Sequence, residues 1–225
     1  MSAEENKALF RRAYEELWNR GNLSVADELI APGAPLTGVK VLGCTGSGSN
    51  SDVIKGVDWV TANATKPAIA NMSLGAGGVS QALDDALRKS ASSGVFYSVV
   101  AGNKGEDACN YSPARAGAGT NNGIMTVAAT DEEDRETSWS NYGPCVDLWA
   151  PGARIPSTKM GGGTTTMGGT SMAAPHGGGA ALYLSRNTSA SPSAVEEALT
   201  SSATTTTATT SKDGAAIVRE RVGGF

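Results

Sequence analysis

Short apolar runs that alternate with helical patterns constrain the fold of this chain more than any other feature. The runs have the length of buried strands and occupy Val39–Gly43, Ala68–Leu74, Gly94–Ala101, Ile124–Ala129 and Val146–Trp149. Apolar side chains at helical spacing predict helices over Asp52–Asn63, Ser80–Ser92 and Ser171–Ser185. Alternating strands and helices with short connections are typical of a parallel sheet, so we expect an α/β fold.

Both ends of the chain depart from this pattern. Residues 1–36 predict a helical hairpin, because Ser2 and Glu5 fit a capping box and Gly21 ends the first amphipathic helix. We interpret it as a packing or dimerising element, separate from a domain of residues 37–225. The tract ATTTTATTS, which begins at Ala203, is low in complexity and predicts an exposed loop. A terminal strand is expected over Ala215–Val222.

Composition excludes several classes of function. Charged residues make up 18% of the chain and its net charge is −4, which predicts neither a nucleic-acid partner nor a polybasic membrane anchor. No apolar run reaches the 18 residues of a membrane span, and the charged N-terminus shows no apolar segment of a secretory signal. Three widely spaced cysteines do not form a CxxC motif and suggest one pair plus one unpaired thiol.

His176 is the only histidine in the sequence. A zinc site with several histidines is therefore excluded, and any catalysis that needs an imidazole from this chain must use His176.

The segment GTSMAAPH, residues 169–176, is the most specific motif. Glycine-rich sequence precedes it and a helical pattern follows, so Ser171 is expected at the start of a helix. A hydroxyl and a backbone amide at that place can face a cleft, and the helix dipole favours a developing negative charge. The alternative interpretation is an ordinary serine or threonine helix cap.

This motif resembles the nucleophile motif of the subtilisin family of serine endopeptidases, in its proteinase K and aqualysin branch. Four other segments resemble the family in the same order along the chain: Asn71–Gly75 (NMSLG), Val100–Asn103 (VAGN), Ala108–Arg115 (ACNYSPAR) and Ser140–Gly152 (SNYGPCVDLWAPG). The resemblance runs from about Val39 to the C-terminus. It implies a three-layer subtilisin-like fold with a parallel sheet, here without the N-terminal strands of the family.

The resemblance also implies roles for individual residues. Ser171 matches the acylating nucleophile, and Asn103 matches the side-chain donor of the oxyanion hole, which it shares with the Ser171 backbone N–H. Three segments match the substrate-binding edges of the family: Ser73-Leu74-Gly75, Ala101-Gly102 and Gly46-Ser47-Gly48. The last of these matches a strand that pairs with an extended polypeptide substrate. A pocket edged by glycines suggests a broad preference for apolar substrate side chains.

Other implications concern stability and location. Cys109 and Cys145 match a disulfide of the aqualysin-like branch, whereas Cys44 matches a cysteine whose partner lies upstream in that branch. Asp147 matches a carboxylate of a structural calcium site, and no cofactor is expected for the chemistry. The family and the disulfide imply an extracellular protein.

The sequence differs from the family in the catalytic triad. The family's aspartate and catalytic histidine lie in segments N-terminal to the matched region, and this sequence shows neither segment. His176 lies five residues beyond Ser171, about 140° around a helix, and it resembles a structural histidine of the family. The chain alone is therefore expected to be a weak or inactive protease.

Two alternatives remain open: a non-catalytic peptide-binding protein and a truncated or chimeric gene product. Residues 6–32 resemble the opening of SnoaL-like polyketide-cyclase domains, although the barrel of such domains does not follow. Three consecutive glycines, 177–179, have no functional explanation at this level and each costs a helix about 1 kcal/mol.

Overall fold

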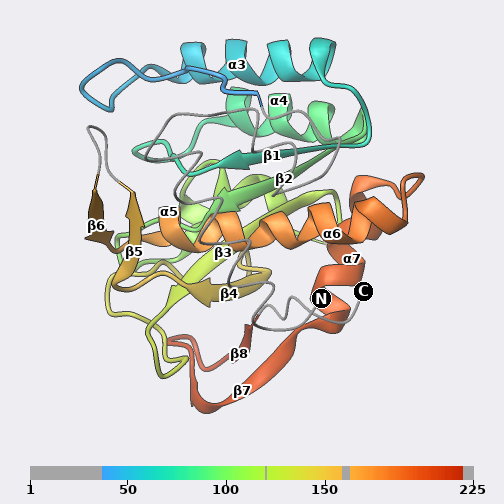
Figure 1. Ribbon diagram of the computed structural model, residues 1–225. Helices are drawn as coiled ribbons and strands as arrows, with labels where there is room; N and C mark the ends of the chain where they lie inside the picture. Colours follow the sequence, from blue (N-terminus) through green and yellow to red (C-terminus); the bar gives the residue numbers. More distant parts are fainter. Residues whose placement is uncertain (1–36, 120, 159–162, 220–225) are drawn as a thin grey trace. The chain divides into compact units, whose positions relative to one another are not determined.

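The computed structural model describes residues 37–119, 121–158 and 163–219 (Figure 1). The helical hairpin expected over residues 1–36, and the SnoaL-like opening with it, lie outside this part of the chain. The chain divides into two units. In the smaller unit, β5 (Ile155–Thr158) and β6 (Thr164–Met167) form an antiparallel pair. The larger unit, within Val39–Arg154 and Gly168–Phe225, contains all the elements discussed below.

A six-stranded sheet forms the centre of the larger unit, in the order β1-β2-β3-β4-β8-β7. Its strands are β1 (Ala68–Met72), β2 (Val95–Val100), β3 (Ile124–Thr130), β4 (Leu148–Pro151), β7 (Thr204–Thr210) and β8 (Ala216–Arg219). From β1 to β8 every neighbouring pair is parallel, and β7 is antiparallel to β8. The predicted α/β class is confirmed.

Helices pack against both faces of the sheet. On one side lie α3 (Asn50–Asn63) and α4 (Gln81–Ser92), which begin after Ser49 and Ser80 and match the predicted helices closely (Figure 1). The other side is covered by four elements: α5 (Thr170–Ala173), the 3₁₀ helix η4 (Ala174–Gly178), α6 (Gly179–Arg186) and α7 (Pro192–Ser202). This gives the three layers that the resemblance implied.

Strand β2 shows how the layers are joined. All six of its residues are buried, as expected for a central strand covered on both faces. Val95, Tyr97 and Val99 pack with α3 and α4, whereas Phe96 and Val100 belong to the core beneath α5, α6 and α7. Strand β3 is buried along its whole length as well.

The strand predicted at Val39–Gly43 is absent, and this prediction was wrong. The segment has no regular secondary structure, and β2 is the only strand paired with β1 in the described sheet. Its apolar side chains pack against a helix instead: a Cβ at Gly56 of α3 would collide with Val41. A strand needs a neighbouring strand to share its backbone hydrogen bonds, and none of the described strands pairs with this segment.

The exposed loop predicted for the threonine tract was also wrong. Residues Thr204–Thr210 form β7, which pairs with β8 and shifts register between Thr205 and Thr210. Threonine is β-branched and favours extended backbone, so the tract forms a strand although its composition is simple. The terminal strand predicted over Ala215–Val222 is present as β8, within the described residues.

The single helix predicted over Ser171–Ser185 is interrupted. The chain passes from α5 through η4 to α6, and the 3₁₀ segment includes two of the three consecutive glycines. Gly177 is required by close packing, because a Cβ there would collide with the side chains of Ser98 and Met125. The same approach lets the Ser98 hydroxyl donate to the Ala174 carbonyl at 2.6 Å. Nothing in the structure explains Gly178, whose Cβ would meet open space.

None of the helices in the described residues is both long enough and apolar enough to cross a membrane.

Candidate active site

A cavity of about 180 Å³ opens at the ends of β1 and β2. Its lining consists of residues 74–76, 100–104 and 111–113, together with Asn141, Thr170 and Ser171. The structure thus gathers at one place most of the residues that the sequence singled out, namely Leu74, Gly75, Ala101, Gly102, Asn103 and Ser171. This is expected of a parallel sheet, whose strand ends lie along a common edge.

Ser171 lies in the first turn of α5, linked to the end of β1. Its hydroxyl donates to the Ser73 carbonyl at 3.2 Å, and the Ser73 hydroxyl donates to the Ser171 carbonyl at 2.8 Å. Ser73, a predicted edge residue, therefore holds the nucleophile candidate at the mouth of the cavity. The backbone N–H of Ser171 has no carbonyl four residues back within α5, as for every first-turn amide, and is a candidate donor to a ligand.

Asn103 follows β2 by three residues, and its orientation is set by Thr170. The Asn103 Oδ1 accepts hydrogen bonds from both the backbone N and the Oγ1 of Thr170, each at 2.8 Å. The amide nitrogen, Nδ2, is therefore the atom left to donate elsewhere. A Cβ at Gly169 would lie 3.3 Å from this nitrogen, so glycine at this position leaves room for a ligand beside the Asn103 Nδ2. Thr170 was not singled out from the sequence, although it belongs to the same motif.

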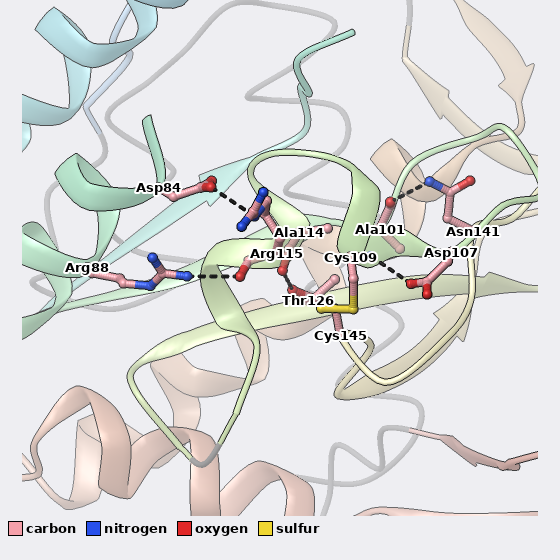
Figure 2. The surroundings of a disulfide bond; sticks show 10 residues. All are labelled: Asp84, Arg88, Ala101, Asp107, Cys109, Ala114, Arg115, Thr126, Asn141 and Cys145. Carbon is pink, nitrogen blue, oxygen red and sulfur yellow. Dashed lines mark hydrogen bonds and ion pairs between the residues drawn. A yellow bond between two sulfur atoms is a disulfide. The ribbon is translucent and has the colours of Figure 1, made fainter. Parts of the chain in front are cut away.

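Asn141 holds the segment that carries Asn103. Its Oδ1 accepts from the backbone N of Lys104 at 2.9 Å and of Glu106 at 3.2 Å, and its Nδ2 donates to the Ala101 carbonyl at 2.9 Å (Figure 2). Its backbone N also donates to the Gly102 carbonyl at 2.9 Å. Asn141 is fully buried. Sequence reasoning missed this role, and the only signal available was its place in the segment Ser140–Gly152.

The far wall of the cavity, residues 111–113, is followed by a short 3₁₀ helix, η3 (Ala114–Gly117). Side chains of α4 and β3 hold this turn, as Figure 2 shows. Asp84 pairs with the Nε of Arg115 at 3.2 Å, Arg88 donates to the Arg115 carbonyl at 3.0 Å, and Thr126 donates to the Ala114 carbonyl at 2.9 Å. Burial raises the pKa of the Asp84 carboxyl, and the neighbouring Arg115 opposes that rise.

The predicted disulfide between Cys109 and Cys145 is confirmed, with Cα atoms 5.3 Å apart (Figure 2). It joins the 3₁₀ helix η2 (Ala108–Asn110) to the segment before β4. The helix begins after Asp107, whose side chain accepts from the Cys109 N–H at 2.8 Å. Cys44 is exposed and forms no disulfide.

His176 lies in η4, half-buried, and its Nδ1 is 3.1 Å from the Ala173 carbonyl. A carbonyl only accepts, so this contact requires a proton on Nδ1. Burial lowers the pKa of the imidazole, which favours its neutral form. The contact ties the ring to its own helix, in keeping with the structural role that the resemblance implied for it.

Gly46, Ser47 and Gly48 do not line the cavity. The structure places them in an exposed turn, where the backbone N of Gly43 donates to the Ser47 carbonyl at 2.9 Å, and not in the strand that was predicted. As for Val39–Gly43, none of the strands in the described part of the chain pairs with them. Their contact with substrate stays a prediction.

The calcium site suggested at Asp147 also stays a prediction. Asp147 accepts from the Thr126 backbone N at 2.6 Å, and burial raises the pKa of its carboxyl to about 8. A carboxyl that holds its proton near neutral pH is a poor ligand for a cation. Within the described residues, no group of three or more His, Cys, Asp or Glu side chains is placed to hold a metal ion. The described residues thus add no support for calcium to the resemblance, and no step is derived through it.

Comparisons with known proteins agree with this geometry. The model of the subtilase family matches residues 21–223. Alkaline serine exoprotease A of Vibrio alginolyticus is 53% identical over 128 residues, which are 57% of this chain and 23% of that protein. The extracellular serine proteinase of Thermus sp. (strain Rt41A) is 54% identical over 128 residues, 57% of this chain and 30% of that protein.

Among solved structures, a cold adapted subtilisin-like serine proteinase superposes with a TM-score of 0.75 at 43% sequence identity. The superposition covers 89% of this chain and 70% of that one. For the Vibrio and Thermus relatives, by contrast, the match spans less than a third of the relative's own length.

Proposed function

Because its match to the subtilase family covers residues 21–223, the chain belongs to that family, and we propose that it acts on polypeptides as a serine endopeptidase with Ser171 as nucleophile. The observation that carries the proposal is the cavity that Ser171 shares with Asn103. An extended polypeptide would place one side chain in this cavity and the following carbonyl beside the Ser171 hydroxyl.

In the proposed reaction, the Ser171 Oγ attacks the substrate carbonyl carbon, and the carbonyl oxygen becomes an oxyanion. The Asn103 Nδ2 and the Ser171 backbone N–H donate to that oxygen. Thr170 supports this role because it occupies the Asn103 Oδ1 with two hydrogen bonds and so leaves the amide hydrogens for the ligand. Such fixed donors stabilise the charge that develops in the transition state.

The proton of Ser171 needs an acceptor. In the structure the hydroxyl donates to the Ser73 carbonyl, and the only imidazole of the sequence contacts the Ala173 carbonyl. With water as the acceptor of the Ser171 proton, the oxyanion re-forms the carbonyl, the C–N bond breaks, and the amine leaves with a proton from water; a second water then hydrolyses the acyl-enzyme. Acylation by this chain alone is slow, because oriented donors and substrate binding without a general base retain only part of the rate. Secretion of the chain belongs to the same proposal, supported by the Thermus relative, which is described as extracellular.

Labelling with a fluorophosphonate tests the nucleophile. We expect slow, stoichiometric labelling at Ser171, found by intact mass and peptide mapping, and none in Ser171→Ala. A matched control, Ser92→Ala on the exposed face of α4, should label like the unaltered chain. Asn103→Ala should slow labelling about 100-fold. Absence of labelling, or labelling that survives Ser171→Ala, would refute the proposal.

A second function, peptide binding without hydrolysis, is favoured by one observation: the Ser171 hydroxyl is engaged by a carbonyl and not by a base. Calorimetry with a hydrolysis-resistant extended peptide distinguishes the two. Binding without labelling of Ser171 supports a binding protein, whereas binding together with labelling supports the endopeptidase.

A further inference from the structure

The cavity beside Ser171 has one charged residue in its lining, Lys104. The side chain is exposed, and its ammonium group forms no hydrogen bond or ion pair with any described residue. The start of the side chain is fixed, because the Lys104 backbone N donates to the Asn141 Oδ1 at 2.9 Å. The Lys104 side chain is thus attached to a backbone position that Asn141 fixes in the cavity wall, one residue after Asn103.

The other charged groups near this point are already engaged. The Glu106 carboxylate accepts a hydrogen bond from the hydroxyl of Tyr111, which lines the cavity, and it forms no ion pair with Lys104. The ammonium of Lys212 pairs with Glu136 at 2.7 Å and donates to the Ser138 carbonyl at 3.0 Å. Among the described residues that line the cavity or lie near Lys104, Lys104 is therefore the cation that remains available to a ligand.

The rest of the lining is uncharged, and it combines polar side chains with an apolar part. Leu74, Val100, Ala101 and Pro113 offer hydrocarbon surface, and Gly75 and Gly102 keep space open. A Cβ at Gly102 would collide with the Nδ2 of Asn141, so close packing requires glycine at this position. A cavity whose uncharged lining is partly apolar, with one cation at its edge, fits a side chain that has an aliphatic stem and a negative end.

We propose that Lys104 makes this cavity select an acidic side chain, glutamate above all, in the polypeptide that Ser171 acts on. The inference deepens the proposed function and rests on it, since it concerns the side chain that precedes the bond to be attacked. It replaces the broad apolar preference expected from the glycine edges alone. The stem of the glutamate lies on the apolar wall, and its carboxylate reaches the Lys104 ammonium.

Peptide binding to the full chain tests this selection without requiring hydrolysis. Acetylated tetrapeptide amides that differ only in their last side chain are compared by calorimetry or NMR titration, with glutamate, glutamine, leucine or lysine at that position. We expect the glutamyl peptide to bind about fivefold more tightly than the glutaminyl one at low salt, the upper range for one exposed ion pair. The preference should shrink in 0.5 M salt, about three times physiological ionic strength, because exposed charges are screened.

Variants identify the residue responsible. Lys104→Ala should bind the glutamyl and glutaminyl peptides equally, and Lys104→Glu should favour the lysyl peptide. Lys40→Ala, which removes an exposed lysine outside the cavity, should keep the fivefold preference. Equal binding of the two peptides by the unaltered chain, or a preference that survives Lys104→Ala, would overturn the inference.

Ser171 labelling on the same samples separates the two proposals. Labelling without glutamate preference leaves the endopeptidase and removes the selection. Glutamate preference without labelling keeps the selection and removes the hydrolysis.

Discussion

Two stretches that were expected to contact substrate are held very differently. The stretch 101–104 is bound to distant parts of the chain by Asn141 and Thr170, whose hydrogen bonds span between 37 and 68 residues of sequence. The stretch 46–48 makes only local backbone hydrogen bonds, from Gly43 to Ser47 and from Gly46 to Gly43, and all three residues are exposed. The first lines a cavity, and the second forms a turn.

The difference teaches that a matched motif becomes a site only where long-range contacts fix it. Thr170 orients the Asn103 side chain, and Asn141 holds the backbone on either side of it, at Ala101, Gly102 and Lys104. The proposed oxyanion donor needs this fixed orientation. Gly46 and Gly48 match the family's substrate strand by resemblance only, and nothing in the described residues presents their backbone to the cavity. The experiments below ask whether stability and reactivity follow this contrast.

The largest effect is expected from the disulfide of the well-held region. Replacing Cys109 and Cys145 together by serine opens a loop of 36 residues and should lower the free energy of unfolding by about 4 kcal/mol in the chain-entropy model. Urea unfolding followed by circular dichroism measures this loss. Cys44→Ser, in the weakly held segment, is the control and should change the same quantity by less than about 0.5 kcal/mol. Similar losses of unfolding free energy in the double variant and in Cys44→Ser would contradict the difference between the two regions.

Asn141→Ala should have the next largest effect. It removes three side-chain hydrogen bonds from a buried position and leaves two backbone amides and one carbonyl without partners. We expect a loss of about 3 kcal/mol in unfolding free energy. Fluorophosphonate labelling of Ser171 should also slow, because Asn103 loses its support.

Asn141→Asp separates the two effects. It keeps an acceptor for Lys104 and Glu106 but loses the donor to Ala101, so its loss should be smaller than that of alanine. Labelling at the rate of the unaltered chain in Asn141→Ala would contradict a positioning role.

The buried carboxyl of Glu196 should make the free energy of unfolding depend on pH. Glu196 of α7 is buried and accepts from the backbone N of Gly123 at 2.7 Å and of Asn122 at 2.8 Å. Burial raises the pKa of this carboxyl from the ordinary glutamate value of 4.5 to about 7. The folded chain therefore keeps a proton that the unfolded chain releases, and stability should fall as pH rises from about 5 to 7 and level off above.

Glu196→Gln should remove that dependence. It should raise the free energy of unfolding on the order of 2 kcal/mol at pH 8 and change it little at pH 4. Thermal unfolding across this pH range is the measurement, with Glu197→Gln, which removes an exposed carboxylate of the same helix, as the control. Equal pH profiles for Glu196→Gln and the unaltered chain would contradict the mechanism.

The same contrast explains how much the sequence could predict. Strands β2 and β3 were predictable because continuous apolar runs suffice for central strands, and Ser171 and Asn103 were predictable because their motifs are specific. The role of Asn141 was not, since it depends on a fold that brings distant segments together. The error at Val39–Gly43 has the same cause: its composition suits a strand, but no strand among the described residues pairs with it. At β7 the reverse holds, because pairing with β8 makes a strand of a simple threonine tract.

The smallest effect is expected at Ser47, and it tests the weakly held region directly. Ser47 is exposed, and in the turn only its backbone carbonyl is engaged, so Ser47→Ala leaves that hydrogen bond in place. The free energy of unfolding should change by less than about 0.5 kcal/mol, as for other exposed substitutions. Labelling of Ser171 should keep its rate, because nothing in the turn reaches the cavity. A marked change in labelling would mean that substrate-sized ligands draw residues 46–48 to the site, and it would restore the substrate strand that the sequence resemblance implied.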